Sequence, residues 1–135
     1  WIKQQVSVGT PASEIGIFVR SESELSRAKS AIIDAGQDAF KITDKFEVNN
    51  NAIAYGTMHL AKGLEFRSVA VIACDEDVLP QQDRLERVTD ASDLAEVYET
   101  ERHLLYVACT RAREHLLVTG VAPGSEFLAD LEHSK

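Results

Sequence analysis

Two uninterrupted apolar runs constrain the fold of this chain more than any other feature. Residues 15–19 read Ile-Gly-Ile-Phe-Val and residues 69–73 read Val-Ala-Val-Ile-Ala, with no polar side chain in either run. A strand that faces solvent on one side alternates apolar and polar residues, whereas a strand buried on both faces does not. The two runs therefore predict inner strands of a mostly parallel sheet that helices cover on both faces.

The rest of the chain alternates between strand and helix patterns, which predicts an α/β fold. Ser21 and Glu24 have the spacing of a capping box, and the helix that follows them is expected to stop at Gly36. A long helix is predicted from Asp93 to about Arg111, and a short one is capped by Ser125. Strands are expected at residues 15–19, 39–42, 52–58, 69–74 and 115–121.

The remaining segments predict loops and bound the domain. Residues 1–13 are expected to be a linker and residues 14–135 one domain, with loops at 43–51 and 75–92. The chain starts with Trp1, which suggests a fragment of something longer. No apolar run approaches the ~20 residues that cross a bilayer, so no membrane contact is expected. The two cysteines match no metal or redox spacing, which predicts reduced core thiols and a cytoplasmic location.

The acidity of the chain is local. Its formal net charge is −8. Residues 75–101 hold ten carboxylates and only two arginines, so this one segment accounts for the whole net charge. The rest of the chain is neutral, which leaves room for a basic groove elsewhere.

Several common sites are missing. The seven glycines include no Gly-Lys dipeptide, so there is no Walker A phosphate loop. Residues 69–74 followed by Asp75-Glu76 resemble a Walker B strand, but without a Walker A loop we interpret them as a buried strand before an acidic loop. The four histidines have no metal-ligand spacing, so no metal site is predicted.

What remains is a set of cationic and polar side chains at the ends of elements. Arg20 follows the first strand, and Arg111 lies where a helix meets a strand. A guanidinium at such a place can bind a phosphate through two parallel hydrogen bonds. His59 and Lys62 could meet nucleic-acid phosphates, and Glu65 could accept hydrogen bonds from a ribose hydroxyl. The ordinary alternative is that the arginines form surface salt bridges and that the His and Lys side chains are solvated.

Three segments together resemble superfamily 1 helicases of the UvrD/Rep type. TMHLAKGLEFRSVAVIACDED (residues 57–77) is similar to motif V of that family, and ETERHLLYVACTRAREHLLVTG (residues 99–120) is similar to motif VI. IGIFVRSESELSRAKSAIIDAG (residues 15–36) resembles the motif IV segment, which is less specific. The chain departs from the family in the short segment between Gly36 and Thr57, where a large accessory domain is common, and at Leu60, where a small polar residue is common.

The resemblance implies the second, carboxyl-terminal RecA-like motor domain of such a helicase, without Walker A. Arg20 and Arg111 would then both face the γ-phosphate as catalytic arginines, with Gly63 and Glu65 also at the nucleotide. Thr57, His59 and Lys62 would line the path of single-stranded DNA. The cofactor would be ATP with Mg²⁺, the metal being held by a first RecA-like domain that this chain lacks.

The function implied is that of an ATP-dependent DNA helicase moving 3′ to 5′, with DNA repair as the implied setting. Its partners would be single-stranded DNA or DNA junctions and the first RecA-like domain of the same chain. The fragment alone is expected to be inactive. Two alternatives stay open: a non-catalytic module that binds nucleic acid or protein with the same fold, and a motor domain fused to a nuclease.

Overall fold

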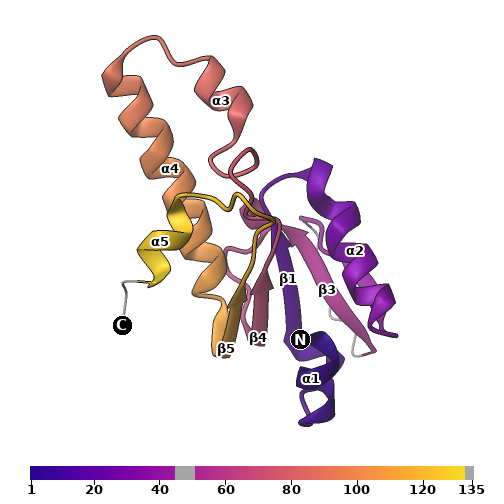
Figure 1. Cartoon of the computed structure of the whole chain (residues 1–135). Coiled ribbons are helices and arrows are strands. Elements are labelled where there is room, and N and C mark those ends of the chain that lie inside the picture. Colours follow the sequence, from indigo (N-terminus) through magenta and orange to yellow (C-terminus); the bar gives the residue numbers. More distant parts are fainter. Residues whose placement is uncertain (45–50, 133–135) are drawn as a thin grey trace.

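The computed structural model describes residues 1–44 and 51–132, which contain one sheet of five parallel strands (Figure 1). The order across the sheet is β2-β3-β1-β4-β5, and each neighbouring pair is parallel. This confirms the predicted α/β class. The strands are β1 (Ile15–Val19), β2 (Asp38–Lys41), β3 (Ala52–Thr57), β4 (Phe66–Val71) and β5 (Ala112–Val118).

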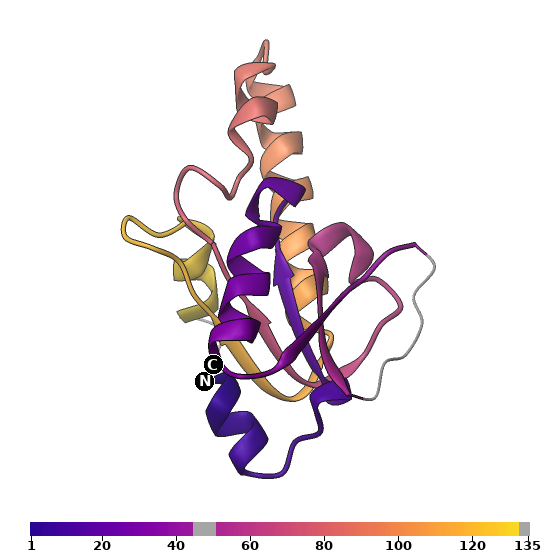
Figure 2. The same cartoon turned by 90° about the vertical axis from the view of Figure 1, so that its right-hand side faces the viewer.

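Helices lie on both faces of the sheet. One face packs against α1 (Ile2–Ser7) and α2 (Leu25–Asp34), and the other against α4 (Ala91–Cys109) and α5 (Phe127–Glu132). The two views show α2 and α4 on opposite sides of the strands (Figures 1 and 2). The start of α4 projects beyond the sheet beside the short α3 (Gln82–Glu86). Three 3-10 turns complete the fold: η1 (Ala12–Glu14), η2 (Glu22–Glu24) and η3 (Met58–Leu60).

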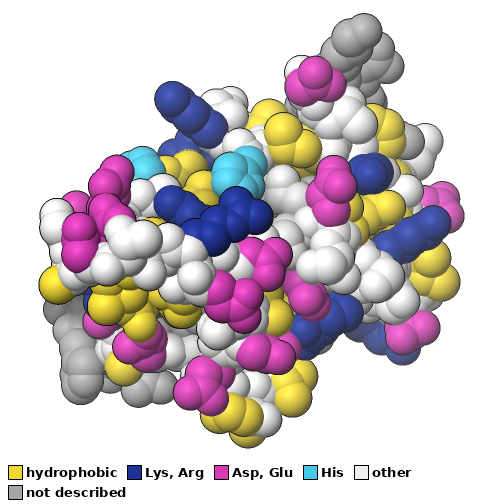
Figure 3. Space-filling model, turned by 90° about the horizontal axis from the view of Figure 1, so that it is seen from above, with side chains coloured by type: hydrophobic (Ala, Val, Ile, Leu, Met, Phe, Trp, Pro, Cys, Tyr) yellow, Lys and Arg dark blue, Asp and Glu magenta, His cyan; other side chains and the backbone are white. Residues whose placement is uncertain are grey.

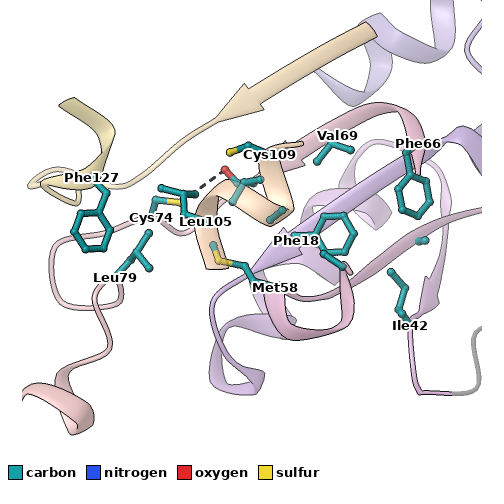
Figure 4. Packing of buried hydrophobic residues seen from close by; sticks show 14 residues of the cluster. Phe18, Ile42, Met58, Phe66, Val69, Cys74, Leu79, Leu105, Cys109 and Phe127 are labelled. Atoms are coloured by element: carbon teal, nitrogen blue, oxygen red, sulfur yellow. Dashed lines mark hydrogen bonds between the residues drawn. The ribbon is translucent and has the colours of Figure 1, made fainter. Parts of the chain in front are cut away.

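Strand β1 explains the first apolar run, because every one of its residues is buried. Ile15, Ile17 and Val19 pack with the α1 and α2 face. Phe18 points the other way and meets Phe66 edge to face, with ring centroids 5.9 Å apart (Figure 4). A Cβ on Gly16 would lie 2.8 Å from the Phe66 ring, so glycine is needed there for the strands to pack.

Helix α2 ends as predicted, but it begins differently. Gly36 has a φ of +78°, and its N–H donates to the Ile33 carbonyl, which is a glycine stop. The capping box does not form, because the Ser21 hydroxyl contacts the hydroxyl of Ser23 at 2.8 Å and makes no cap hydrogen bond. Glu24 instead accepts from Arg27. A 3-10 turn therefore replaces the expected first turn of the helix.

Two segments expected to be irregular contain structure. Residues 2–7 form α1 with Ile2 and Gln5 buried, and the Gln5 side chain accepts a hydrogen bond from Ser68 Oγ at 2.8 Å. This stretch therefore packs on the sheet as a short helix, and the division at residue 14 between a linker or trimmed entry and the domain stays a prediction. The acidic loop 75–92 includes α3. Of the loop predicted at 43–51, residues 45–50 lie outside the described part.

The end of the chain and the cysteines agree with the sequence-based expectation. Ser125 Oγ accepts a hydrogen bond from the Phe127 N–H at 3.2 Å, so it caps the last helix. Cys74 and Cys109 are free and buried in the cluster under α4 (Figure 4). Burial raises the pKa of Cys74 to about 12 and that of Cys109 to about 11, so both stay protonated thiols. Among the described residues, no helix combines the length and apolarity that crossing a membrane requires.

Candidate functional site

The short connection between β3 and β4 carries most of the predicted site. Strand β1 lies between these two parallel strands, so residues 58–65 must run from the carboxyl end of β3 to the amino end of β4. We call residues 58–65 the crossover. It opens with η3, turns at Gly63, whose φ is +82°, and enters β4 at Phe66. It therefore touches both ends of the sheet.

At the amino end of the sheet, the crossover meets Arg111. The Arg111 Nε donates to the Val107 carbonyl at 3.1 Å, and its Nη1 donates to the Leu64 carbonyl at 3.4 Å. The N–H of Phe66 in turn donates to the Arg111 carbonyl at 2.9 Å. These bonds fix the crossover against the end of α4 and leave the half-buried guanidinium partnered only by backbone carbonyls and the Thr110 hydroxyl among the described residues.

Glu65 and Gly63 lie beside Arg111 on this end of the crossover, and both are exposed. The Glu65 carboxylate is 3.7 Å from the Nε of Arg113, a loose contact, while the Nη2 of Arg113 is 3.0 Å from Glu14. Exposed ion pairs of this kind stabilise a fold by only about 0–1 kcal/mol. Glu65 is therefore available as a hydrogen-bond acceptor for a ligand.

At the carboxyl end of the sheet, Arg20 follows β1 beside the end of β3, where Val19 pairs with Thr57. Arg20 is 3% exposed. Its Nε donates to Glu101 Oε1 at 2.8 Å and its Nη2 donates to Glu101 Oε2 at 2.7 Å, which is a two-point fork. The same Nη2 donates to the Gln81 side chain at 3.1 Å. Arg20 thus forms a buried ion pair with Glu101 rather than an ion pair at the surface.

Glu101 is the centre of this cluster, and it is fully buried. Besides the Arg20 fork, its carboxylate accepts from the Gln81 N–H at 2.6 Å and from Arg84 Nη1 at 3.0 Å. Burial favours the protonated acid, but the hydrogen bonds from Arg20 and Gln81 oppose it, and the net result is a lowered pKa for Glu101. The carboxylate is therefore ionised and neutralised by two arginines.

His59 borders the same cluster. Burial, followed by the positive charges of Arg20 and Arg84, lowers the pKa of His59 below its usual value, so the ring is neutral at physiological pH. In Figure 3, which looks down on this end of the strands, Lys, Arg and His side chains gather in the middle of the face with carboxylates around them. Of the three residues predicted to meet DNA, His59 and Lys62 are exposed, whereas Thr57 is only 9% exposed.

The structure separates the two arginines that the sequence pairs at one phosphate. Arg20 follows a strand and Arg111 precedes one, so in an all-parallel sheet they lie at opposite ends. Arg20 contacts Glu101, and α4 rises ~1.5 Å per residue, so about 15 Å of helix lies between that contact and Arg111. Arg111 lies with Gly63 and Glu65, and Arg20 lies with Thr57 and His59; the expectation that both arginines face one γ-phosphate stays a prediction.

Sequence reasoning missed Glu101 and its partners. It grouped Glu101 with the acidic segment and gave that segment no role. A signal was present, because Glu101, Leu105 and Ala108 fall on one helical stripe and all three are buried in α4. A carboxylate on such a stripe needs a cationic partner, although the sequence could not say that the partner is Arg20.

Asp75, which follows β4 as a Walker B aspartate would, has structural partners. It is 2.6 Å from Arg27 Nη1 and accepts from the Val121 N–H at 2.6 Å. The Arg27 hydrogen bond lowers the pKa of Asp75. Within the described ranges, no three His, Cys, Asp or Glu side chains group as metal ligands. Asp75 thus ties α2 and the end of β5 to the loop after β4.

Comparison with known proteins gives one family match over most of the chain. The profile of the UvrD-like helicase C-terminal domain matches residues 16–122. The chain is 41% identical over 76 residues, 56% of its length, to the ATP-dependent DNA helicase PcrA of Leuconostoc citreum. It is 37% identical over 73 residues, 54% of its length, to the ATP-dependent DNA helicase Rep of Buchnera aphidicola. These matches cover 9% and 10% of those two proteins, so the chain spans about a tenth of their length.

One solved structure has the same fold. It is the C-terminal domain of a possible DNA helicase from Lactobacillus plantarum, with a TM-score of 0.66 and 24% sequence identity. The match covers 97% of this chain and 68% of that one. At this identity the likeness supports the five-stranded α/β architecture and nothing finer.

Proposed function

Because the chain belongs to the family of UvrD-like helicase C-terminal domains, we propose that it is the second motor domain of an ATP-dependent DNA helicase. In this role it completes an ATP site together with a first RecA-like domain and forms part of the path of single-stranded DNA. The observation that carries the proposal is the crossover, one short segment that runs between the two ends of the sheet and holds His59 and Lys62 as well as Gly63 and Glu65.

The last residues of the crossover, at the amino end of the sheet, form the proposed nucleotide side. Glu65 is exposed and accepts hydrogen bonds, which suits a ribose hydroxyl. Gly63 has no atom within 4 Å of the position a Cβ would take, so its backbone can come close to a ligand. Arg111 supplies the cation. Its guanidinium is held by backbone carbonyls, which leave its charge uncompensated by any carboxylate among the described residues.

Arg111 is the proposed cross-cleft arginine. A guanidinium that meets the γ-phosphate stabilises the charge that develops as the phosphoryl group leaves, a contribution of roughly 10³ to 10⁵ in rate. ATP would bring Mg²⁺ with it, held by the first domain, and this chain would contribute Arg111, Glu65 and the Gly63 backbone. This geometry supports Arg111 rather than Arg20 in that role.

The carboxyl end of β3 is the proposed DNA side. His59 is exposed at the start of the crossover and Lys62 is exposed next to Gly63, and both can contact phosphates and sugars of a single strand. Thr57 is nearly buried, so its contribution is limited to the edge of this surface. Closure of the ATP cleft would move the Gly63 end of the crossover and hence the His59 end, which couples hydrolysis to a step along DNA.

The proposal is tested by the ATPase rate of the full-length protein that contains this chain, measured against single-stranded DNA concentration. DNA should stimulate the wild type, and Arg111→Ala should lose on the order of 10³-fold or more while still binding DNA. Arg67→Ala is the matched control, because Arg67 is a partly exposed arginine at the same end of β4 that forms an exposed ion pair with Glu114. It should keep the wild-type rate.

The alternative is a non-catalytic module that keeps the fold and binds nucleic acid or protein. The ion pair that neutralises Arg20 favours it, because one of the two predicted phosphate arginines is already occupied. A full-length protein without DNA-stimulated ATPase would establish this alternative and exclude the helicase role. An Arg111→Ala protein with the wild-type rate would show that Arg111 is a structural residue.

A further inference from the structure

Glu101 occupies a position where an ionised carboxylate is costly. It lies in the middle of α4, fully buried, between apolar neighbours on the same helical stripe. Burial of a charge is tolerated only when it is paired and hydrogen-bonded, and a well-packed apolar residue is often at least as stable there. The free energy of folding alone therefore does not account for the Arg20–Glu101 pair. Its effect on the orientation of the Arg20 side chain offers a functional reason.

The pair holds one edge of the Arg20 guanidinium. The Nε and Nη2 groups are taken by Glu101 and Gln81. No hydrogen bond to the Nη1 group is present in the described part of the chain, and the Arg20 side chain as a whole is 4% exposed. The guanidinium is thus fixed through Nε and Nη2, and its Nη1 is left without a hydrogen bond among the described residues, near the carboxyl ends of β1 and β3.

Glu101 is itself fixed from a second direction. The Gln81 N–H and Arg84 bind the same carboxylate, and both come from the segment that contains α3. The Arg84 side chain is 33% exposed, whereas that of Glu101 is fully buried. The carboxylate therefore has little freedom to rotate, and the orientation of Arg20 follows from it.

We propose that Glu101 is a positioning residue that holds Arg20 so that its Nη1 edge meets a phosphate group at the carboxyl ends of β1 and β3. The phosphate belongs either to the DNA backbone or to the nucleotide. This inference rests on the proposed function for the presence of those ligands. Its own content is that Arg20 acts on a phosphate only when Glu101 orients it.

The first arm of the test measures binding of a fluorescein-labelled oligothymidine to the chain by anisotropy over a salt series. Glu101→Gln removes a negative charge, so a purely electrostatic effect would strengthen DNA binding. Loss of positioning should instead weaken it by about tenfold or more, the value of a charge-assisted hydrogen bond. The slope of log affinity against log salt should fall by about 0.7 for the lost phosphate contact. Glu99→Gln, an exposed site on the same helix, is the control for charge and should bind at least as tightly as the wild type.

The second arm measures ATP hydrolysis by the full-length protein at saturating DNA. If the phosphate is that of the nucleotide, Glu101→Gln lowers kcat by about 10²-fold, the cost of a small misplacement of a catalytic group. The KM for ATP stays near the wild-type value, and so does the DNA affinity. A change confined to the first arm assigns the phosphate to DNA, and a change confined to the second assigns it to the nucleotide.

A third measurement reports the fork directly. In the ¹⁵N spectrum of the chain, the Nε–H of Arg20 should give a resolved, slowly exchanging signal in the wild type that is lost in Glu101→Gln. If Glu101→Gln does not fold, the double variant Glu101→Gln/Arg84→Gln is used in its place, because it removes one of the two cations that the single variant leaves unpaired. Arg84→Gln alone is its control.

Three results would overturn the inference. The first is a folded Glu101→Gln protein with wild-type DNA binding and wild-type kcat, in which case the pair is only structural while the helicase role stands. The second is a wild-type spectrum without the protected Arg20 signal. The third is a wild-type protein that neither binds DNA nor hydrolyses ATP, which shows that the proposed function has failed, and the positioning role with it.

Discussion

The Nη1 of Arg111 donates to the Leu64 carbonyl at 3.4 Å and joins the last turn of α4 to the crossover. The contact links two segments whose separate motifs suggested one site, and it is made through the backbone. Arg111 has no carboxylate partner among the described residues, whereas Arg20 has a buried one. The two arginines therefore differ in what their removal leaves behind.

Arg20→Ala should destabilise the chain far more than Arg111→Ala. Removal of Arg20 leaves the Glu101 carboxylate buried with only the partly exposed Arg84, a loss of about 3–5 kcal/mol in the free energy of unfolding. Removal of Arg111 loses hydrogen bonds to carbonyls at a half-exposed site, about 1 kcal/mol. Urea unfolding of the two variants gives the comparison. Equal effects would mean that the Glu101 carboxylate readily becomes protonated or hydrated without Arg20.

The 135-residue chain alone should not hydrolyse ATP. It has no Walker A loop, and half of a two-domain site does not fix the phosphates or the attacking water. A steady-state phosphate-release assay, with and without single-stranded DNA, makes the measurement. Turnover that persists through repeated purification and is lost in Arg111→Ala would show that the site is complete within this chain.

Stability should fall in two steps as the pH is lowered. The folded-state pKa of His59 is lowered mainly by burial, so the unfolded chain binds its proton first, and stability begins to fall near pH 6.5. The pKa values of Glu101 and Asp75 are also lowered, so their contributions are present above about pH 4.5 and are lost as these groups take up protons. Urea unfolding at a series of pH values measures both steps.

Two variants separate the steps. His59→Gln should remove the upper step and leave the lower one. Asp75→Asn should reduce the lower step, because it removes the hydrogen-bonded partner of Arg27, and leave the upper one. An upper step that survives in His59→Gln would assign it to another group.

Ala73→Gly should be nearly neutral for stability. Ala73 has a φ of +58°, and an L-residue in this left-handed region is strained by about 1–2 kcal/mol. Glycine relieves that strain but loses a buried methyl group, about 0.8 kcal/mol, and a further ~0.5–1 kcal/mol of chain entropy. Ala70→Gly is the control: Ala70 is equally buried in β4 without the positive φ, so it should lose the whole ~1–2 kcal/mol. Equal losses at the two sites would show that Ala73 is not strained.

The strands could be predicted from local pattern, and the cluster around Glu101 could not. Residues 15–19 and 69–73 have no polar residue, and a buried parallel strand is the main structure that such a run allows. The Arg20–Glu101 pair joins residues that are 81 positions apart, and the acidic segment offers many other carboxylates. Only the packing of α4 on the sheet selects one of them.

The separation of Arg20 from Arg111 could have been predicted from the sequence. Arg20 comes after a predicted strand and Arg111 before one, so an all-parallel sheet places them at opposite ends. The resemblance to a known family suggested one shared phosphate for the two arginines, which stays a prediction beside this consequence of strand direction. The crossover was likewise recognised as a loop, but its passage from one end of the sheet to the other depends on β1 lying between β3 and β4.

The central place of β1 also governs the order in which the chain can fold. Its partners are β3 and β4 rather than β2, the strand that follows it, so both edges of the most apolar strand wait for residues 52–57 and 66–71. During synthesis, this strand is made before both of its partners. Parallel pairing between distant segments is slow, and unpaired apolar strands associate with other chains in the meantime. Residues 15–19 therefore have no strand partner until residues 52–57 and 66–71 have been made, which is the interval in which this chain is most exposed to association with others.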